Sequence, residues 1–354
     1  MTREQTKQIM VGGVPVGGGA PVTVQSMCNT KTQDAAATLA QMRELRDAGC
    51  DIIRVAVPDM AAAQALPAIM ADAPMPVVAD IHFDHRLALM AAEAGVSAVR
   101  INPGNIGAPE RVEAVARACR ERGIPIRIGV NSGSVEKSVL AKHGGPTAEA
   151  LVESAAGEIE ALRGFGFDDI ALSVKASDVP TAVAAYRLAA ERFSCPLHVG
   201  VTEAGTSYGG LVNSSVGIGT LLMEGIGDTI RVSLTADPIE EVRAGLSILR
   251  ACGLRKQGVR FVSCPTCGRT SIDLIGLAKA AEARLSGLSR DITVAVMGCE
   301  VNGPGEAASA DFGVAGGKGF GSLFRKGRVV KTRIPEAELL DALMALIEET
   351  PDGE

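Results

Sequence analysis

The stretch Ala98-Val-Arg-Ile-Asn102 decides the fold, because it is a short apolar run interrupted by a single Arg. Three other runs, at 52–57, 125–130 and 229–233, have the same character. Segments rich in Ala, Leu, Glu and Arg separate such runs, and their apolar residues have the spacing of amphipathic helices. A chain in which short strands alternate with helices is predicted to form a parallel sheet covered by helices.

The first 250 or so residues contain enough such units for a closed barrel. We expect eight strands, at Val22–Ser26, Ile52–Val57, Pro76–Ile81, Ala98–Ile101, Ile126–Val130, Ile170–Val174, Leu197–Val201 and Thr229–Ser233. The helices between them include Ala35–Ala48, Pro109–Arg122, Ala148–Arg163 and Val179–Glu191. This number and size match a (β/α)₈ TIM barrel, with a doubly wound open sheet as the alternative. The glycine-rich stretch 12–19 precedes no helix, so we interpret it as an N-terminal hairpin or barrel plug.

The pattern changes after about residue 257, which predicts a second domain. We therefore divide the chain into residues 1–257 and residues 258–354, the latter large enough for a core of its own. We expect strands at Val259–Ser263 and Asp291–Met297, helices at Asp273–Leu285 and Glu336–Glu348, and a glycine-rich β region at Phe312–Val330. The second domain is thus predicted to be a small α+β unit.

Composition excludes several classes of protein. The 354 residues are 47% hydrophobic with a net charge of −6 and no basic run, which argues against nucleic-acid binding. Eight irregularly spaced Cys in so long a chain are not a disulfide framework. The N-terminus lacks the apolar region of a signal peptide, and no run of 18 apolar residues is present. We therefore expect a cytoplasmic protein without a membrane span.

Two loops of the second domain carry candidate metal ligands. Cys264 and Cys267 lie in Cys-Pro-Thr-Cys-Gly, and Cys299 and Glu306 lie in a second glycine-rich loop. Three thiolates and one carboxylate suit a soft metal or an iron–sulfur cluster, and the carboxylate would be a replaceable ligand. A structural zinc site remains an alternative, although a second Cys-x-x-Cys pair and nearby His ligands are missing. A dithiol redox pair is a further alternative.

Cations stand at several strands of the predicted barrel, whose active groups should lie at the carboxyl ends of the strands. The candidate residues there, in chain order, are Arg54, Asp80, His82, Arg100, Asn102, Arg127, Asn131, Lys175, His198, Arg231 and Ser233. Five cations that converge without matching acids would repel one another, so we expect a multiply charged anion such as a diphosphate. A structural ion-pair network is the alternative.

Glu203 follows the seventh predicted strand and is the acid best situated to exchange a proton there. A helix cap or a salt-bridged carboxylate is its other interpretation. His82 and His198 are candidates for polarising a substrate oxygen, and each is equally compatible with a hydrogen-bonded core histidine.

Six motifs together resemble the 4-hydroxy-3-methylbut-2-enyl diphosphate synthases, the bacterial two-domain form of that family. The motifs are Val-Gln-Ser-Met (24–27), Arg-Ile-Asn-Pro-Gly-Asn (100–105), Gly-Val-Asn-Ser-Gly-Ser (129–134), Gly-Val-Thr-Glu-Ala-Gly (200–205), Ser-Cys-Pro-Thr-Cys-Gly-Arg-Thr (263–270) and Met-Gly-Cys-Glu-Val-Asn-Gly-Pro-Gly-Glu (297–306). The resemblance extends from about residue 10 to residue 330, and the last two motifs are the most specific. One departure is Cys28, where Thr is more often expected; a reactive thiol at that position is a hypothesis to test.

The resemblance implies a specific reaction. The substrate would be 2-C-methyl-D-erythritol 2,4-cyclodiphosphate, which is opened and reductively dehydroxylated with two electrons to (E)-4-hydroxy-3-methylbut-2-enyl diphosphate, in the methylerythritol phosphate route to isoprenoids. It further implies a [4Fe–4S] cluster held by Cys264, Cys267, Cys299 and Glu306. Glu203 would supply the proton that turns the departing hydroxyl into water, and Asn302 would orient the substrate.

The resemblance also implies partners. Flavodoxin or ferredoxin would deliver the electrons, and a homodimer would let each cluster domain cap the barrel of the other chain. Two alternatives remain: a barrel synthase for a pterin-type diphosphate with a structural zinc domain, and a non-catalytic regulator or carrier that bears a cluster. The regulator has no need of five cations in the barrel.

Overall fold

The computed structural model describes residues 1–256, 258–288, 290–299, 305 and 308–351. The chain folds into two compact units, Met1–Arg255 and Lys256–Glu354. The predicted domain boundary at residue 257 itself lies outside the described residues. Each unit is described separately below.

The first unit is a barrel of parallel strands, as the sequence predicted. The strands are β3 (Thr23–Met27), β4 (Ile52–Ala56), β5 (Val77–Asp80), β6 (Ala98–Ile101), β7 (Ile126–Asn131), β8 (Ile170–Lys175), β9 (His198–Val199) and β10 (Thr229–Ile230). Their order in the sheet is β8-β7-β6-β5-β4-β3-β10-β9. A parallel bridge between Leu172 and Leu197 joins β8 to the residue before β9 and nearly closes the ring. The open-sheet alternative is therefore wrong.

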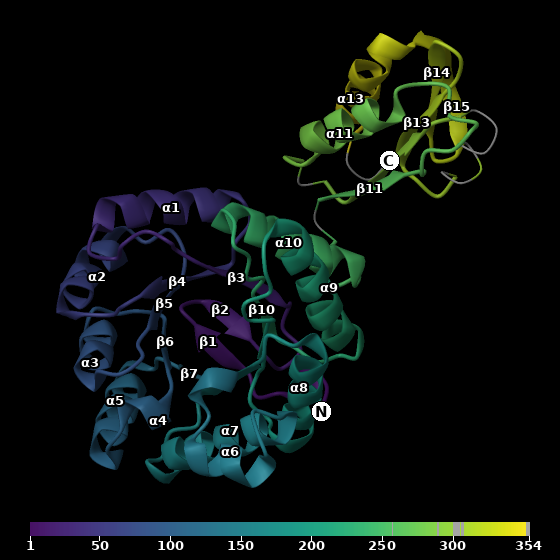
Figure 1. The fold of residues 1–354 in the computed structure, drawn as a ribbon. Helices are drawn as coiled ribbons and strands as arrows, with labels where there is room; N and C mark the ends of the chain where they lie inside the picture. Colours follow the sequence, from purple (N-terminus) through teal and green to yellow (C-terminus); the bar gives the residue numbers. More distant parts are fainter. Residues whose placement is uncertain (257, 289, 300–304, 306–307, 352–354) are drawn as a thin grey trace. The chain divides into compact units, whose positions relative to one another are not determined.

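Helices surround the strands on the outside of the barrel (Figure 1). They are α1 (Ala35–Asp47), α2 (Met60–Asp72), α3 (His85–Glu93), α4 (Pro103–Ile106), α5 (Pro109–Arg122), α6 (Lys137–His143), α7 (Ala148–Gly164), α8 (Val179–Arg192), α9 (Ser207–Met223) and α10 (Pro238–Ala251). Short 3₁₀ turns lie at Arg3–Gln5 and Ser132–Ser134. Most of the buried aliphatic residues of strands and helices form one continuous core between the two layers.

Aspartates begin many of these helices. The side chains of Asp34, Asp59, Asp84, Asp178 and Asp237 each accept a hydrogen bond from a backbone N–H of the following first turn. Such N-caps satisfy amide groups that have no partner within the helix, and they fix where each helix starts. The candidate site lies in the loops that lead from strands to helices. The caps fix the ends of these loops where they join the helices.

A hairpin closes the amino-terminal end of the barrel. Strands β1 (Ile9–Val11) and β2 (Val14–Val16) pair antiparallel, and Ile9, Val11 and Val16 are buried in one cluster with residues of four barrel strands. The hairpin-and-plug interpretation of the glycine-rich N-terminal stretch is thereby confirmed. The carboxyl ends of the strands are left for binding, as in other barrels of this type.

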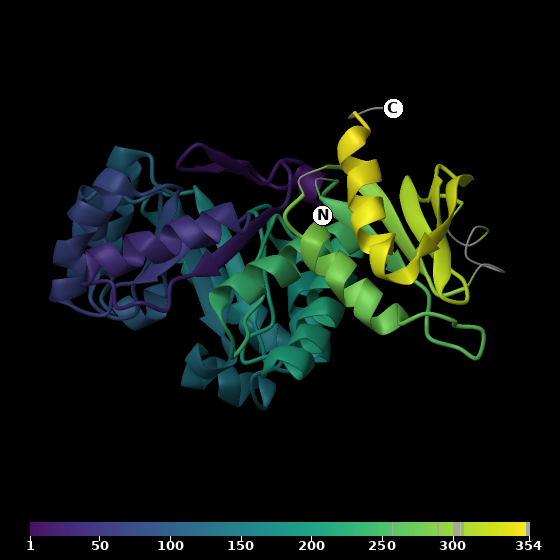
Figure 2. The ribbon, with the colours of Figure 1, turned by 90° about the horizontal axis from the view of Figure 1, so that it is seen from above.

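The second unit is a five-stranded sheet with two helices on one face (Figure 2). The strands are β11 (Val259–Ser263), β12 (Ile292–Met297), β13 (Phe312–Gly316), β14 (Phe320–Arg325) and β15 (Arg328–Pro335), in that order across the sheet. Strands β11, β12 and β13 are parallel, and the last two pairings are antiparallel. The helices α11 (Leu274–Leu285) and α13 (Leu339–Glu349) bury their apolar sides against the sheet.

Within the described residues, no helix is long and apolar enough to cross a membrane.

Candidate functional site

The candidate site in the first unit lies inside the barrel toward the carboxyl ends of the strands. Arg100, Arg127 and Lys175 are buried, with 6, 6 and 7% of their surface exposed, although each is charged in water. Arg54 and Arg231 are partly buried beside them. The five side chains are close enough for their charges to affect one another. We call these five residues the cation cluster.

Burial and mutual repulsion disfavour the charged forms of the cation cluster. Burial, followed by the charges of Arg54 and Arg231, holds the pKa of Lys175 well below its usual value. Burial also holds the pKa of Arg127 well below its usual value, and neighbouring arginines add to the effect. The pKa of Arg54 falls to about 9, mainly because of burial and against the opposing charge of Asp80. A bound anion would relieve this repulsion.

Two carboxylates accompany the cations, which corrects the expectation that matching acids are absent. Asp80 Oδ1 lies 3.1 Å from Arg100 Nη1, and Asp80 Oδ2 lies 3.6 Å from Arg54 Nε. Burial by itself would raise the pKa of Asp80, but Arg54, His82 and Arg100 outweigh it and keep this pKa well below its usual value. Glu241 on α10 lies 3.5 Å from Arg231 Nη2. Five cations therefore face two carboxylates, and the excess positive charge remains.

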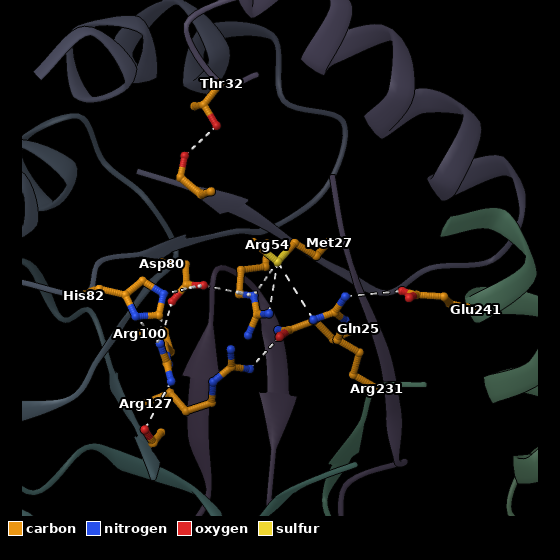
Figure 3. A network of polar contacts seen from close by, with 12 residues as sticks. Gln25, Met27, Thr32, Arg54, Asp80, His82, Arg100, Arg127, Arg231 and Glu241 are labelled. Carbon is orange, nitrogen blue, oxygen red and sulfur yellow. Dashed lines mark hydrogen bonds and ion pairs between the residues drawn. The ribbon is translucent and has the colours of Figure 1, made fainter. Parts of the chain in front are cut away.

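Arg127 has one nitrogen in a hydrogen bond and one without a partner among the described residues. Its Nη1 donates to Gln25 Oε1 at 2.5 Å, whereas its Nη2 is buried and has no partner among the described residues (Figure 3). A cavity of about 30 Å³, room for about one water molecule, lies between this pair and the hairpin. Arg127 is the second residue of β7, so it stands deeper than the strand end at which it was expected.

Met27 is a site residue that the sequence analysis missed. Its Sδ accepts hydrogen bonds from Nε and Nη2 of Arg54, at 3.1 and 3.0 Å, and lies 3.8 Å from Nη1 of Arg231 (Figure 3). A thioether is a weak acceptor. An anionic oxygen would therefore displace it readily from both guanidinium groups.

The two histidines differ in environment. His82 is half exposed. Its ring nitrogens lie 3.3 Å from Arg100 Nη1, and its Nε2 lies 3.6 Å from Asp80 Oδ2. His198 is fully buried, and neither ring nitrogen has a partner among the described residues. Burial, Arg127 and Lys175 hold the pKa of His198 well below its usual value, so its imidazole is neutral at physiological pH. His198 is therefore a core histidine, as one of its two interpretations had it, but the expected hydrogen bond to its ring is missing among the described residues.

Glu203 stands alone in a strained backbone conformation. Its φ is 53°, one of the few positive values at a residue other than Gly in the described chain. The side chain is exposed and makes no hydrogen bond or ion pair with any described residue, and the N-cap of α9 is Thr206. The cap and salt-bridge interpretations of Glu203 therefore do not apply. Strain of this kind is often retained at functional sites.

The remaining predicted residues of the barrel lie at strand ends. Asn102 caps α4 through its Oδ1, which accepts from the N–H of Asn105 at 3.0 Å, and its buried Nδ2 has no described partner. Asn131 ends β7, and Ser233, which is partly buried, follows β10.

Cys28 is 6% exposed and burial raises the pKa of its thiol to about 12, so the hypothesis of a reactive thiol there is wrong.

The candidate metal site in the second unit is built on two neighbouring parallel strands. Cys264 directly follows β11 and Cys299 follows β12 by two residues, so both leave the sheet at the same edge. The N–H of Gly298 donates to Cys264 Sγ at 3.2 Å. A Cβ on Gly298 would lie 2.9 Å from a Leu274 methyl and 3.0 Å from that of Thr270, so Gly keeps this approach open.

Cys267 is exposed, and the pKa of its thiol is lowered. A backbone hydrogen bond from Arg269, together with the charge of Arg269 and the Thr270 hydroxyl, lowers its pKa. Asn302 and Glu306 lie outside the described residues. Among the residues that the structure does describe, no three His, Cys, Asp or Glu side chains are grouped closely enough to hold a metal ion. The donor chemistry of thiolates with an amide N–H on sulfur nevertheless fits a soft metal or an iron–sulfur cluster.

Comparisons with known proteins agree with both units. A family model described as the GcpE TIM-barrel domain matches residues 6–246, and one described as the GcpE protein C-terminal domain matches residues 260–349. A protein of Geobacter sulfurreducens named 4-hydroxy-3-methylbut-2-en-1-yl diphosphate synthase (flavodoxin) is 59% identical over 346 residues, 98% of each chain. A protein of the same name from Clostridium perfringens is 56% identical and covers 98% of this chain and 99% of its own.

A solved structure resembles part of the chain. The N-acetylneuraminic acid synthetase of Leptospira borgpetersenii aligns with a TM-score of 0.52 and 13% identity, over 70% of this chain and 90% of its own. This likeness supports the barrel fold and nothing about activity. The matches to the family models and to full-length relatives confirm the resemblance that the sequence motifs indicated.

Proposed function

We propose, because the chain belongs to the GcpE family, that it converts 2-C-methyl-D-erythritol 2,4-cyclodiphosphate into (E)-4-hydroxy-3-methylbut-2-enyl diphosphate. In this reaction two electrons enter, the ring bond between carbon and a phosphate oxygen breaks, and a hydroxyl group leaves as water after taking a proton. The observation that carries the assignment within the barrel is the cation cluster, five cations against two carboxylates. A cyclic diphosphate supplies the missing negative charge.

The cation cluster would hold the diphosphate. The free Nη2 of Arg127 and the ammonium group of Lys175 lack acidic partners among the described residues, so they are the first donors that a phosphate would engage. Arg54 and Arg231 would exchange the sulfur of Met27 for phosphate oxygens, which accept stronger, charge-assisted hydrogen bonds. Asp80 and His82 would keep Arg100 oriented.

The second unit would hold a [4Fe–4S] cluster through Cys264, Cys267, Cys299 and Glu306. When bound, the cluster would supply the two electrons to the substrate one at a time. The chain's own contribution is the hydrogen bond from the Gly298 N–H to Cys264 Sγ, which orients that sulfur, and the lowered pKa of Cys267. We propose flavodoxin as the electron donor, because the relatives carry it in their names. A cluster on free thiolates needs a reducing compartment, so we also propose a cytoplasmic location.

Glu203 would donate the proton to the departing hydroxyl, and Glu203→Gln tests this role. We expect a fall in kcat of about 10²- to 10⁴-fold, the usual contribution of a general acid. Iron content should stay unchanged, because Glu203 lies in the barrel unit. The measurement is anaerobic turnover with reduced flavodoxin, in which ³¹P NMR distinguishes the cyclic diphosphate from the linear product.

Glu191 is exposed on α8, so Glu191→Gln is the matched control and should keep full activity. Wild-type protein that contains iron and binds the substrate but yields no linear diphosphate would contradict the proposed function. Full activity of Glu203→Gln would contradict the role of Glu203 alone.

We propose further that the chain acts as a homodimer. The cation cluster and the cysteines belong to different units, and the reaction needs both at one substrate. This need is met if the second unit of one chain acts on the substrate bound in the barrel of the partner chain. If so, an equal mixture of Lys175→Met and Cys264→Ser proteins, each inactive alone, should recover about a quarter of the wild-type rate after subunit exchange. No recovery in subunits that demonstrably exchange would mean that each chain serves its own barrel.

A further inference from the structure

The hairpin of β14 and β15 concentrates positive charge in a chain whose net charge is −6. No Asp or Glu occurs between Phe312 and Pro335, whereas six basic residues do: Lys318, Arg325, Lys326, Arg328, Lys331 and Arg333. Five of them lie within residues 325–333, which we call the basic hairpin. This segment corrects the expectation that the chain has no basic run.

The basic hairpin is open to solvent at one edge of the sheet. β15 is the last strand in the order of the sheet, and seven of its eight residues are exposed (Figure 1). The four cations from Lys326 to Arg333 are all exposed, and none of them forms an ion pair with a described residue. Their charge therefore remains available to a partner.

The backbone of the basic hairpin is strained at two of its cations. The φ angles are 46° at Lys326 and 58° at Arg333, two of the three positive values at residues other than Gly in the described chain. Lys326 and Gly327 form a two-residue turn that places Arg325 in register with Arg328. Turns of this kind favour Asn-Gly, and like charges in register destabilise a hairpin. Positive charge is thus retained against local stability, which is common at functional positions.

The turn of the basic hairpin lies against the segment that follows the candidate ligand Glu306. The N–H of Lys326 donates to the carbonyl oxygen of Asp311 at 3.0 Å. A Cβ placed on Gly327 would lie 3.1 Å from the carbonyl oxygen of Ala308. Glu306 itself lies outside the described residues, but the chain two residues beyond it is in contact with the turn.

The strand before the turn also packs close to a candidate ligand. Phe324, which directly precedes the basic hairpin, is buried in one cluster with Met297 and Ala310, and Cys264 packs against this cluster. A protein bound at the basic hairpin would therefore lie near the candidate metal site from two directions along the chain.

We propose that the basic hairpin is the docking surface for the electron carrier, a flavodoxin with acidic residues around its flavin. Val329 and Val330, 51 and 50% exposed, supply an apolar centre, and the cations supply a charged rim, as in transient protein interfaces. Opposite charges raise the rate at which such a complex forms. Each encounter would oxidise the carrier by one electron, so two encounters supply the reaction. The inference rests on the proposed function, which requires electrons to reach the cysteines from another protein.

Two other uses of a basic hairpin fit these residues less well. Charged side chains protect edge strands from pairing with other chains, but that role does not explain two exposed valines or strain at the cations. Nucleic-acid binding is disfavoured by the net charge of −6 and by the absence of any aromatic residue from 325–333.

The test compares two double variants that remove the same charge from the second unit. Lys326→Asn with Arg328→Gln changes the basic hairpin and keeps the turn, because Asn suits a positive φ. Lys279→Gln with Arg284→Gln removes two exposed cations from α11 and is the matched control. Calorimetric titration of an oxidised, net negatively charged flavodoxin into anaerobic holoenzyme gives the dissociation constant. We expect a rise of about 10-fold for the hairpin variant at low salt, and of less than about twofold for the control.

Three further readouts separate docking from a structural role. Added salt should weaken wild-type binding and reduce the difference between the hairpin variant and the wild type. Arg328→Lys, which keeps the charge, should keep the affinity. The urea midpoint of the hairpin variant should equal or exceed that of the wild type, because strain and like-charge repulsion are removed.

Equal flavodoxin affinities of the hairpin variant and the wild type would overturn the inference. So would a short duplex DNA that binds the wild type and not the hairpin variant, if flavodoxin affinity is the same for both. Weaker flavodoxin binding that appears only together with a lowered urea midpoint would also overturn it.

Turnover with dithionite separates this inference from the proposed function, because so small a reductant needs no docking surface. The two double variants should turn over at the same rate with dithionite. Wild-type protein that is active with dithionite but binds no flavodoxin would overturn the inference and leave the proposed function standing. Protein that shows the predicted affinities but makes no linear diphosphate with either reductant would contradict the proposed function and leave the docking surface standing.

Discussion

Replacing Cys264 with Ser is expected to abolish both iron binding and turnover. A hydroxyl group does not ionise at neutral pH and cannot replace a thiolate as a ligand of a soft metal. Changes to residues that merely support a metal ligand cost 10- to 100-fold, so loss of a ligand itself should lower turnover by more than about 100-fold. The measurement is iron, sulfide and zinc content of anaerobically purified protein, with the visible absorption spectrum and the turnover rate.

The position of Cys264 explains why the effect should be large. Its sulfur accepts the N–H of Gly298, and its own N–H donates to the carbonyl oxygen of Val296 at 3.4 Å, so two neighbouring strands fix it. Cys252→Ser is the matched control, because Cys252 is a partly buried cysteine at the end of α10 in the barrel unit. That variant should keep its iron. Stoichiometric zinc in the wild type, or iron retained by Cys264→Ser, would contradict the cluster proposal.

The sequence was sufficient to predict the barrel, because short apolar runs alternate with segments of helical spacing, and several of the helices begin at a capping aspartate such as Asp34 or Asp178. The seventh and eighth strands are shorter than predicted: β9 covers two residues and β10 two. Close packing explains part of this difference. A Cβ on Gly200 would lie 2.6 Å from the carbonyl oxygen of Arg231, so the chain after β9 approaches its neighbour more tightly than a regular strand does.

Much less of the candidate site was predictable. The cations were visible because each interrupts an apolar run, but their partners were not. Glu241 lies ten residues after Arg231 on a helix, and its sequence context resembles that of an exposed first-turn acid. Met27 is the last residue of β3 and looks in the sequence like any core residue, yet its sulfur lies between two guanidinium groups. Which of these side chains meet depends on closure of the barrel, which brings β10 beside β3.

Glu158 illustrates the same limit from the opposite direction. In the sequence it is one more acid in a helix rich in Glu, beside the exposed Glu160. In the fold, α7 packs against α4, Glu158 is buried, and its Oε1 lies 3.6 Å from a Cβ placed on Gly104. The regular backbone of a strand can be predicted from residue pattern, whereas convergence of side chains from separate loops requires the fold itself.

Replacing Arg127 with Gln is expected to remove most activity without weakening the fold. Truncating one partner of a buried, hydrogen-bonded charge pair costs about 2–5 kcal/mol of binding, which corresponds to roughly 30- to 5,000-fold in kcat/KM. Part of the loss should appear as a raised KM, because the free Nη2 of Arg127 is proposed to contact the diphosphate.

Stability should respond in the opposite direction to activity. Burial and the neighbouring Arg54 and Arg100 disfavour the charged form of Arg127 in the folded protein, so a neutral side chain relieves an unfavourable interaction. The Gln amide can still donate toward Gln25, whose Oε1 now accepts from Arg127. The urea midpoint of Arg127→Gln should therefore equal or exceed that of the wild type.

The combination of lost activity and retained stability separates a ligand site from a structural ion-pair network. Arg120→Gln, which removes an exposed guanidinium from α5, is the matched control and should leave kcat/KM unchanged. If Arg127 served the structure, its replacement would lower the urea midpoint, and added substrate would not change that difference. If it serves the substrate, the wild type gains more stability from the cyclic diphosphate than Arg127→Gln does, because only ligand bound to the folded state shifts the unfolding equilibrium. In that case the cation cluster lowers the stability of the protein in the absence of ligand, and binding of the anionic substrate offsets this cost.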